Sequence, residues 1–95
     1  MREEVQDRNG NPVYLTDERW EHILEEHFEL EEHRAEVIST VRSGKRTQDP
    51  LIPSKFYYNK KFPHLNEEFD EVEVVVLFRW QNDQPNNFIL TAYPA

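Results

Sequence analysis

The spacing of apolar residues divides the chain into a helical part and an extended part. Within residues 16–44 the apolar side chains recur every three or four positions, and from residue 47 onward they alternate with polar ones or form short continuous runs. The first spacing is typical of amphipathic helices and the second of strands. Helices followed by strands predict an α+β fold, in which two N-terminal helices pack on an antiparallel sheet of four to five strands.

The helical part predicts two helices joined by a short link. The first follows Thr16, a residue type favoured at helix N-caps, and is expected over residues 17–28. Trp20, Ile23, Leu24 and His27 recur on one side of this helix and form its apolar stripe. The second helix is expected over residues 30–43.

The segments on either side of the helices complete a single predicted domain, 1–95. Residues 1–15 are expected to form a hairpin or an extended segment, because Asn9-Gly10 is the strongest two-residue hairpin signal. Pro12 is more typical of an edge strand or a plain turn. Gly44 directly follows the second predicted helix, at a position where glycine is common. The helices therefore occupy residues 16–44 and the sheet residues 47–95.

The extended part predicts strands at residues 47–49, 56–60, 71–80 and 88–93, with a turn at 81–87. Alternation groups Val72, Val74 and Val76 on one face, and we expect the helices to cover this face together with Phe88, Leu90 and Ala92. The other face is less apolar at one end. Arg79, Thr91 and Tyr93 are expected to gather there with Tyr57 or Tyr58. Ordinary amphipathic strands would produce the same pattern.

Composition narrows the class of protein. The chain has 95 residues, of which 25 are Leu, Ile, Val or Phe, a share above the roughly 20% below which highly charged chains stay disordered. It has no cysteine, which excludes disulfides, thiolate catalysis and cysteine-ligated metals. It has neither a signal-peptide pattern nor an apolar run of the length that spans a bilayer. We therefore expect a cytoplasmic protein that does not contact membranes.

The net charge of −8 conceals a segregation of charge along the chain. Residues 37–64 hold six basic side chains and one acidic one, a net of +5, whereas the segments on either side are acidic. Aromatic residues alternate with cations in this basic segment, a pattern suited to stacking bases and pairing phosphates. A short strand that places aromatic side chains in the core and charged side chains at its solvent-exposed ends would have the same sequence pattern. The candidate RNA-binding residues are Lys55, Tyr57, Tyr58, Lys60 and Lys61.

The histidines offer acid–base chemistry without a metal. His22 and His27 are five residues apart, about 140° around a helix, and this spacing does not chelate a metal ion on one face. We expect no metal and no other cofactor. His27 lies in the apolar stripe, where a lone histidine is often structural, and His22 points away from it. Cleavage of RNA needs a base, an acid and a cation, which histidine, tyrosine and arginine side chains can supply.

The order of motifs resembles the small phage- and cyanobacteria-associated nuclease-like domains grouped with barnase, EndoU, the colicin-type tRNases and RelE. The resemblance covers roughly residues 12–94 and rests on the motifs Val13-Tyr14-Leu15-Thr16, Arg19-Trp20-Glu21-His22-Ile23, Glu26-His27-Phe28-Glu29-Leu30, Tyr57-Tyr58, Glu73-Val74-Val75-Val76-Leu77-Phe78 and Phe88-Ile89-Leu90-Thr91-Ala92-Tyr93.

This resemblance implies a metal-independent endoribonuclease of a toxin-like type. RNA would be its substrate, and an antitoxin or another protein its partner. The catalytic positions of the family pattern fall on His22, His27, Arg79, Thr91 and Tyr93. A second hypothesis is a non-catalytic module that binds a protein or regulates one on the same fold, with the acidic helices as a docking face.

Overall fold

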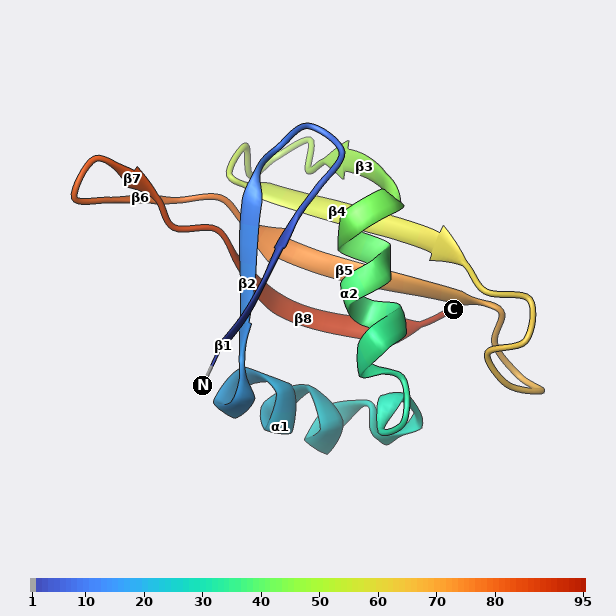
Figure 1. Cartoon of the computed structure of the whole chain (residues 1–95). Helices are drawn as coiled ribbons and strands as arrows, with labels where there is room; N and C mark the ends of the chain where they lie inside the picture. The colour runs from blue at the N-terminus through green and yellow to red at the C-terminus, as the bar shows by residue number, and fades with distance from the viewer. Residues whose placement is uncertain (1) are drawn as a thin grey trace.

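The computed structural model describes residues 2–95 (Figure 1). Two helices, α1 (Asp17–Glu26) and α2 (Arg34–Ser43), are joined through the 3-10 turn η1 (Phe28–Leu30). The strands are β1 (Arg2–Gln6), β2 (Pro12–Thr16), β3 (Lys45–Gln48), β4 (Lys55–Lys61), β5 (Glu71–Leu77), β6 (Trp80–Gln81), β7 (Gln84–Pro85) and β8 (Phe88–Pro94). No helix within residues 2–95 is long and apolar enough to cross a lipid bilayer.

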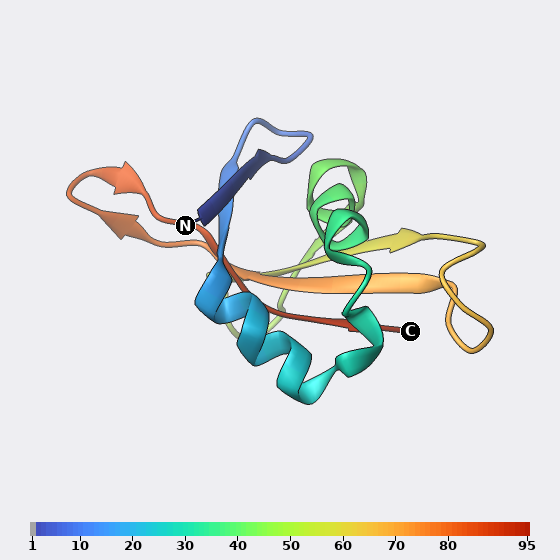
Figure 2. The same ribbon diagram turned by 60° about the horizontal axis from the view of Figure 1, so that its bottom comes forward.

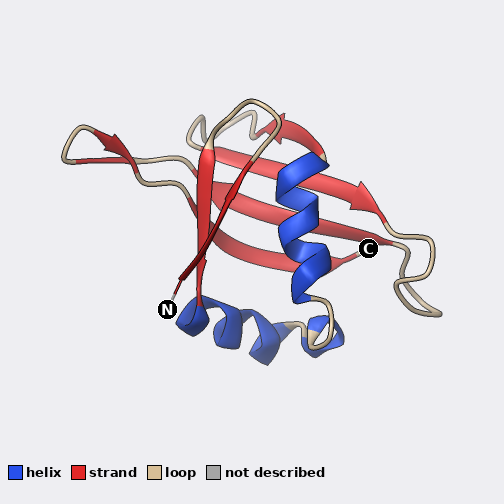
Figure 3. Cartoon of the chain, viewed as in Figure 1, coloured by secondary structure: helices blue, strands red, loops and turns tan. Residues whose placement is uncertain are grey.

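The α+β class is confirmed, but the sheet differs from the prediction. It has six strands in the order β1-β2-β8-β5-β4-β3, and β6 and β7 form a separate two-stranded ribbon (Figure 3). Because β2 runs parallel to β8, through the pair Tyr14 and Phe88, the sheet is mixed. The prediction of four to five antiparallel strands is therefore wrong: the N-terminal hairpin, β1 with β2, adds two strands beside the last one.

The first helix begins where expected but ends early, and the second begins later than predicted. Thr16 caps α1, since its Oγ1 accepts a hydrogen bond of 3.0 Å from the amide of Arg19. The first helix ends at Glu26, and the second begins at Arg34 instead of residue 30. The intervening 3-10 turn lets Leu30 reach the core, where it is fully buried, while its acidic neighbours stay in solvent.

Gly44 ends α2 for a steric reason. Its φ of −73° is accessible to any residue, so no left-handed conformation is required. A Cβ at this position would lie 2.3 Å from the carbonyl oxygen of Thr40 and 2.8 Å from that of Asn59. The missing side chain thus lets the chain pass closely from the helix into β3.

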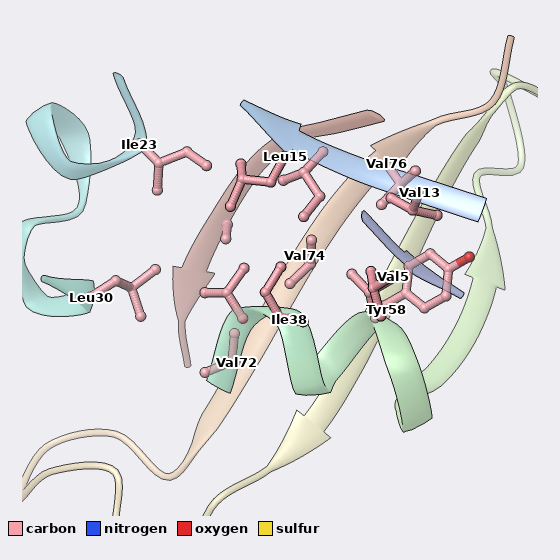
Figure 4. Close-up of a cluster of buried hydrophobic side chains, with 14 of the residues drawn as sticks. Val5, Val13, Leu15, Ile23, Leu30, Ile38, Tyr58, Val72, Val74 and Val76 are labelled. Atoms are coloured by element: carbon pink, nitrogen blue, oxygen red, sulfur yellow. The ribbon is translucent and has the colours of Figure 1, made fainter. Parts of the chain in front are cut away.

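One face of the sheet carries the core. The N-terminal hairpin crosses the strands in front of this face, α2 packs on β4 and β5, and α1 lies along the part of the β8 edge that β2 does not pair with (Figures 1 and 2). Val72, Val74 and Val76 of β5 point into this layer as predicted and meet Leu15 and Ile38 (Figure 4). No helix of the described residues packs on the opposite face of β4 and β5 in these views.

A β-bulge changes the predicted facing of β8. The pairs Val75 with Thr91 and Val76 with Ile89 leave one extra residue in β8 between them. Ile89 therefore joins Ala92 in the core, and Phe88 lies across from Leu77 on the opposite face. The prediction that Phe88, Leu90 and Ala92 share the helix-covered face is wrong for this reason.

Candidate active site on the uncovered face of the sheet

The strand register gathers polar side chains on the face that the helices leave uncovered. Glu73 of β5 pairs with Asn59 of β4 on one side and with Tyr93 of β8 on the other. Residues directly opposite one another in antiparallel strands point to the same face. These three side chains therefore form a row across the middle of the sheet.

A second row lies beside the first. Val75 of β5 pairs with Tyr57 of β4 and with Thr91 of β8. Val75 is almost fully buried but does not belong to the core cluster. We infer that neighbouring side chains on the uncovered face shield it from solvent. Thr91 and Tyr93 thus lie on one face with Tyr57, as the alternation predicts.

Tyr93 and Glu73 form the central interaction of this face. The Tyr93 hydroxyl donates a hydrogen bond to Oε2 of Glu73. Burial, this hydrogen bond and the neighbouring carboxylate together raise the pKa of Tyr93 to about 12. Tyr93 consequently keeps its proton at neutral pH and holds one oxygen of the carboxylate in place. Oε1 of Glu73 makes no hydrogen bond within residues 2–95.

His27 reaches this row from the end of α1. It is the C-cap residue, and its backbone leaves the helical conformation there, with φ −134° and ψ 66°. Its ring lies 5.8 Å from the Tyr93 ring, centre to centre, at an interplanar angle of 42°. Because α1 runs along the edge of β8, this half-buried imidazole stands at the border of the uncovered face.

A shallow groove continues from Glu73 toward the opposite edge of the sheet. It is lined by Lys45 and Thr47 of the edge strand β3, by Tyr57 and Asn59 of β4, and by Glu73. Lys45 supplies an exposed cation. The hydroxyl of Tyr57 donates a 2.6 Å hydrogen bond to Asp49, which raises the pKa of Tyr57 and lowers that of Asp49. The groove therefore offers a cation, an aromatic ring and a carboxylate within one depression.

A scan against protein-family models, a search of curated proteins and a search of solved structures return no significant match to this chain. Within residues 2–95 no group of three His, Asp or Glu side chains is arranged to hold a metal ion. The groove itself contains a carboxylate, a lysine and a tyrosine.

The structure separates His22 from the other predicted catalytic residues. Its side chain is exposed, and its ring nitrogens lie 3.7 Å and 3.8 Å from the carboxylates of Glu25 and Glu26. Three of the six residues that line the depression beside it on α1 are glutamates. His22 therefore lies outside the candidate active site.

Arg79 also lies apart from His27 and Tyr93. It comes two residues after the end of β5, and its guanidinium lies 5.9 Å from the centre of the Phe88 ring. Phe88 begins β8, whereas Tyr93 lies near its end. The predicted grouping of Arg79 with Thr91 and Tyr93 is not found, because Arg79 lies beyond one end of β5, Tyr93 pairs with Glu73 near the other end, and Thr91 pairs with Val75 between them.

Two predicted RNA-binding residues point into the covered layer. Tyr58 is 1% exposed and donates a 2.6 Å hydrogen bond to Asp7. The ammonium of Lys60 donates to the hydroxyls of Ser39 and Ser43, at 2.8 Å and 2.7 Å. The predicted contact of Tyr58 and Lys60 with RNA is thus contradicted, since strand alternation turns both toward α2 and the core.

The remaining predicted RNA-binding residues lie on the uncovered side. Lys55 pairs with Leu77, and its ammonium lies 5.8 Å from the centre of the Tyr57 ring. Lys61 is exposed and pairs with Glu71.

The sequence analysis did not predict three residues of the candidate site, Glu73, Asn59 and Lys45. A signal existed for Glu73, since alternation in residues 71–80 already places it on the same face as Val75.

Proposed function

We propose that this chain is a metal-independent endoribonuclease whose active site is the uncovered face at Glu73, Tyr93 and His27. The observation that carries the proposal is the meeting of a carboxylate, a protonated tyrosine and an imidazole beside a groove that also contains a lysine and a second tyrosine. A kinship with the barnase and RelE group is part of this proposal.

The proposed reaction uses the 2′-hydroxyl of the RNA as its nucleophile. A base removes the proton of this hydroxyl, its oxygen attacks the adjacent phosphorus, and the bond to the 5′-oxygen breaks as an acid protonates the leaving oxygen. Glu73, whose Oε1 is free to accept a proton, is the base, and His27, whose imidazolium form can donate one, is the acid. The products are a 2′,3′-cyclic phosphate and a free 5′-hydroxyl.

The other groove residues have supporting roles. The hydrogen bond from Tyr93 occupies Oε2 of Glu73 and leaves Oε1 to accept the proton. Lys45 at the edge strand stabilises the charge that develops on the phosphate oxygens. The Tyr57 ring provides a stacking surface for a base, and its hydroxyl is held by Asp49.

The test is cleavage of a mixed single-stranded RNA in the presence of EDTA. Wild type is compared with His27→Gln and Glu73→Gln, and His22→Gln on the same helix is the matched control. We expect each of the first two changes to lower the rate by about 10²–10⁴-fold and the control to retain the wild-type rate. RNA with a 2′-deoxy nucleotide at the cut position should not be cleaved there.

Two results would contradict the proposal. The first is the absence of cleavage by the wild-type chain, which would favour a non-catalytic binding module. The second is an equal rate for wild type, His27→Gln and Glu73→Gln, which would trace the activity to another site or to a contaminating nuclease.

A further inference from the structure

A second group of arginines and aromatic rings lies at the end of the sheet where β8 begins. Tyr14 and Phe88 are 6.1 Å apart, centre to centre, and are held together by the pairing of β2 with β8. The Arg2 guanidinium lies 4.1 Å from the Tyr14 ring centre, and Arg79 lies 5.9 Å from that of Phe88. The Tyr14 hydroxyl donates a 2.9 Å hydrogen bond to Asn86, which fixes the ring in the fold.

A groove lies beside this pair of rings. It is lined by Tyr14, Thr16, Arg19, Phe88 and Ile89. The side chains of Arg19 and Arg79 form no ion pair with any carboxylate of residues 2–95, whereas Arg2 is paired with Glu4 at 3.0 Å. Two arginines next to Phe88 are therefore available for an anion.

Trp80 adds an exposed aromatic side chain to this end of the molecule. It follows Arg79 directly and is 75% exposed. It belongs to the β6–β7 ribbon, which projects from the sheet (Figure 1). Asn82 and Asp83 both have positive φ, as two-residue hairpin turns require, so the ribbon is closed by a defined turn. Burial in the core does not account for a tryptophan at this position.

We propose that this end of the sheet is a second subsite for single-stranded RNA, in which Arg19 and Arg79 bind phosphate and Trp80 stacks on a base. The inference rests on the proposed function, because it extends the same substrate beyond the cleavage groove. Leu77, opposite Phe88, lies four residues from Glu73 along β5, or about 13 Å at the rise of a strand. One strand of RNA can therefore occupy both places.

The combination of two guanidinium groups without ion pairs and one exposed tryptophan favours RNA over an apolar protein segment. Arginine binds phosphate through several donors in one plane. Every base offers a face for stacking, so an exposed tryptophan binds single strands with little dependence on sequence. In duplex RNA the bases are already stacked, and the subsite should discriminate against it.

The experiment measures binding of a short single-stranded RNA to His27→Gln, which on the proposed mechanism cleaves it about 10²–10⁴-fold more slowly than wild type. In this background we expect Trp80→Ala, Arg19→Gln and Arg79→Gln each to raise Kd about fivefold or more. Trp80→Phe keeps an aromatic face and should retain most of the affinity. Arg42→Gln, an exposed arginine of α2 on the covered side, is the charge-matched control and should leave Kd unchanged.

Tryptophan fluorescence gives an independent measurement. The chain has two tryptophans, and Trp20 is only 8% exposed. Bound RNA should therefore quench the emission of Trp80, and the quenching should disappear in Trp80→Phe. Unchanged Kd in the three variants, or no binding of single-stranded RNA at all, would overturn the inference and leave a protein as the candidate occupant.

The two proposals fail in distinguishable ways. Cleavage that depends on His27 and Glu73, with Kd unaffected by Trp80→Ala, would reject the subsite alone. Binding of RNA that depends on Trp80 and Arg79, without any cleavage, would reject the nuclease and keep the subsite.

Discussion

Replacing Tyr58 with phenylalanine tests the interaction that joins the N-terminal hairpin to the sheet. The Tyr58 hydroxyl donates a 2.6 Å hydrogen bond to Oδ2 of Asp7, in the turn between β1 and β2. Asp7 is 7% exposed, and its carboxylate also accepts hydrogen bonds from the amides of Asn9 and Asn11 and from the Asn11 side chain. Arg46 lies 3.8 Å from the same oxygen.

The expected cost follows from the kind of bond that is removed. A hydrogen bond to a charged group contributes about 1.5–3 kcal/mol, and Tyr58→Phe removes one while the other three donors to Asp7 remain. We therefore expect a loss of about 2 kcal/mol in the free energy of unfolding at pH 7. Asp7→Asn should cost at least as much, because all four partners are donors and an amide NH₂ group must face some of them.

The pH dependence identifies the carboxylate as the partner. Burial works to raise the pKa of Asp7, but the hydrogen bonds from Tyr58 and Asn11 outweigh it and lower that pKa from the ordinary 3.8. A lowered pKa in the folded state stabilises the fold above pH 3.8, and this contribution is lost as the pH falls through the folded-state pKa. The difference between wild type and Tyr58→Phe should therefore be largest near neutrality and shrink below pH 3.8.

The measurement is urea unfolding followed by tryptophan fluorescence between pH 3 and pH 7. Tyr57→Phe is the matched control, because its hydroxyl bonds an aspartate in an exposed loop and its loss should change stability much less. A difference below about 0.5 kcal/mol for Tyr58→Phe at pH 7, or one that stays constant down to pH 3, would refute the reasoning.

Three further predictions follow from single contacts. Gly44→Ala should lower the free energy of unfolding by about 1–3 kcal/mol, since its Cβ meets the Thr40 carbonyl at 2.3 Å; a fully stable variant in urea would contradict this. Thr16→Ala should cost about 1 kcal/mol in the same assay, and Thr16→Ser much less. The raised pKa of Tyr93, about 12 against an ordinary 10.0, contributes stability that is present below pH 10 and lost as the pH rises through 12; in an alkaline titration of tyrosinate absorbance, Tyr93→Phe should remove the amplitude of one tyrosine near pH 12, while Tyr57 and Tyr58, whose pKa values are also raised, still titrate late.

Strand alternation predicts one part of the candidate site, the separation of its polar face from the core face of β5. The alternation of residues 71–80 separates Val72, Val74 and Val76 from Glu73 and Val75, and the structure keeps this separation. The order of helices before strands likewise predicts the α+β class. These features depend on local period and burial, which a single sequence records.

Other features depend on contacts that no local pattern records. The choice between Tyr57 and Tyr58 depends on which strand face meets the helices, and the register with Val74 turns Tyr58 inward. The bulge in β8 reverses the facing of Phe88 without any glycine or proline to mark it. The parallel contact of β2 with β8 joins segments more than 70 residues apart, which loop lengths alone do not predict.

The distribution of charge in the folded chain also could not be predicted from the local sequence, and it affects the proposed function. Along the sequence the cations concentrate in residues 37–64, yet Lys60 of that segment binds two serines of α2 and faces the covered side. Arg19 and Arg79 come from the acidic segments, and folding brings both beside Phe88. With Lys45 they give three cations for phosphates, and single-stranded RNA should then bind with a slope of log K against log salt near −2. The net charge of −8 therefore limits the strength of RNA binding but does not exclude it, because folding, and not position along the chain, decides which cations a nucleic acid meets.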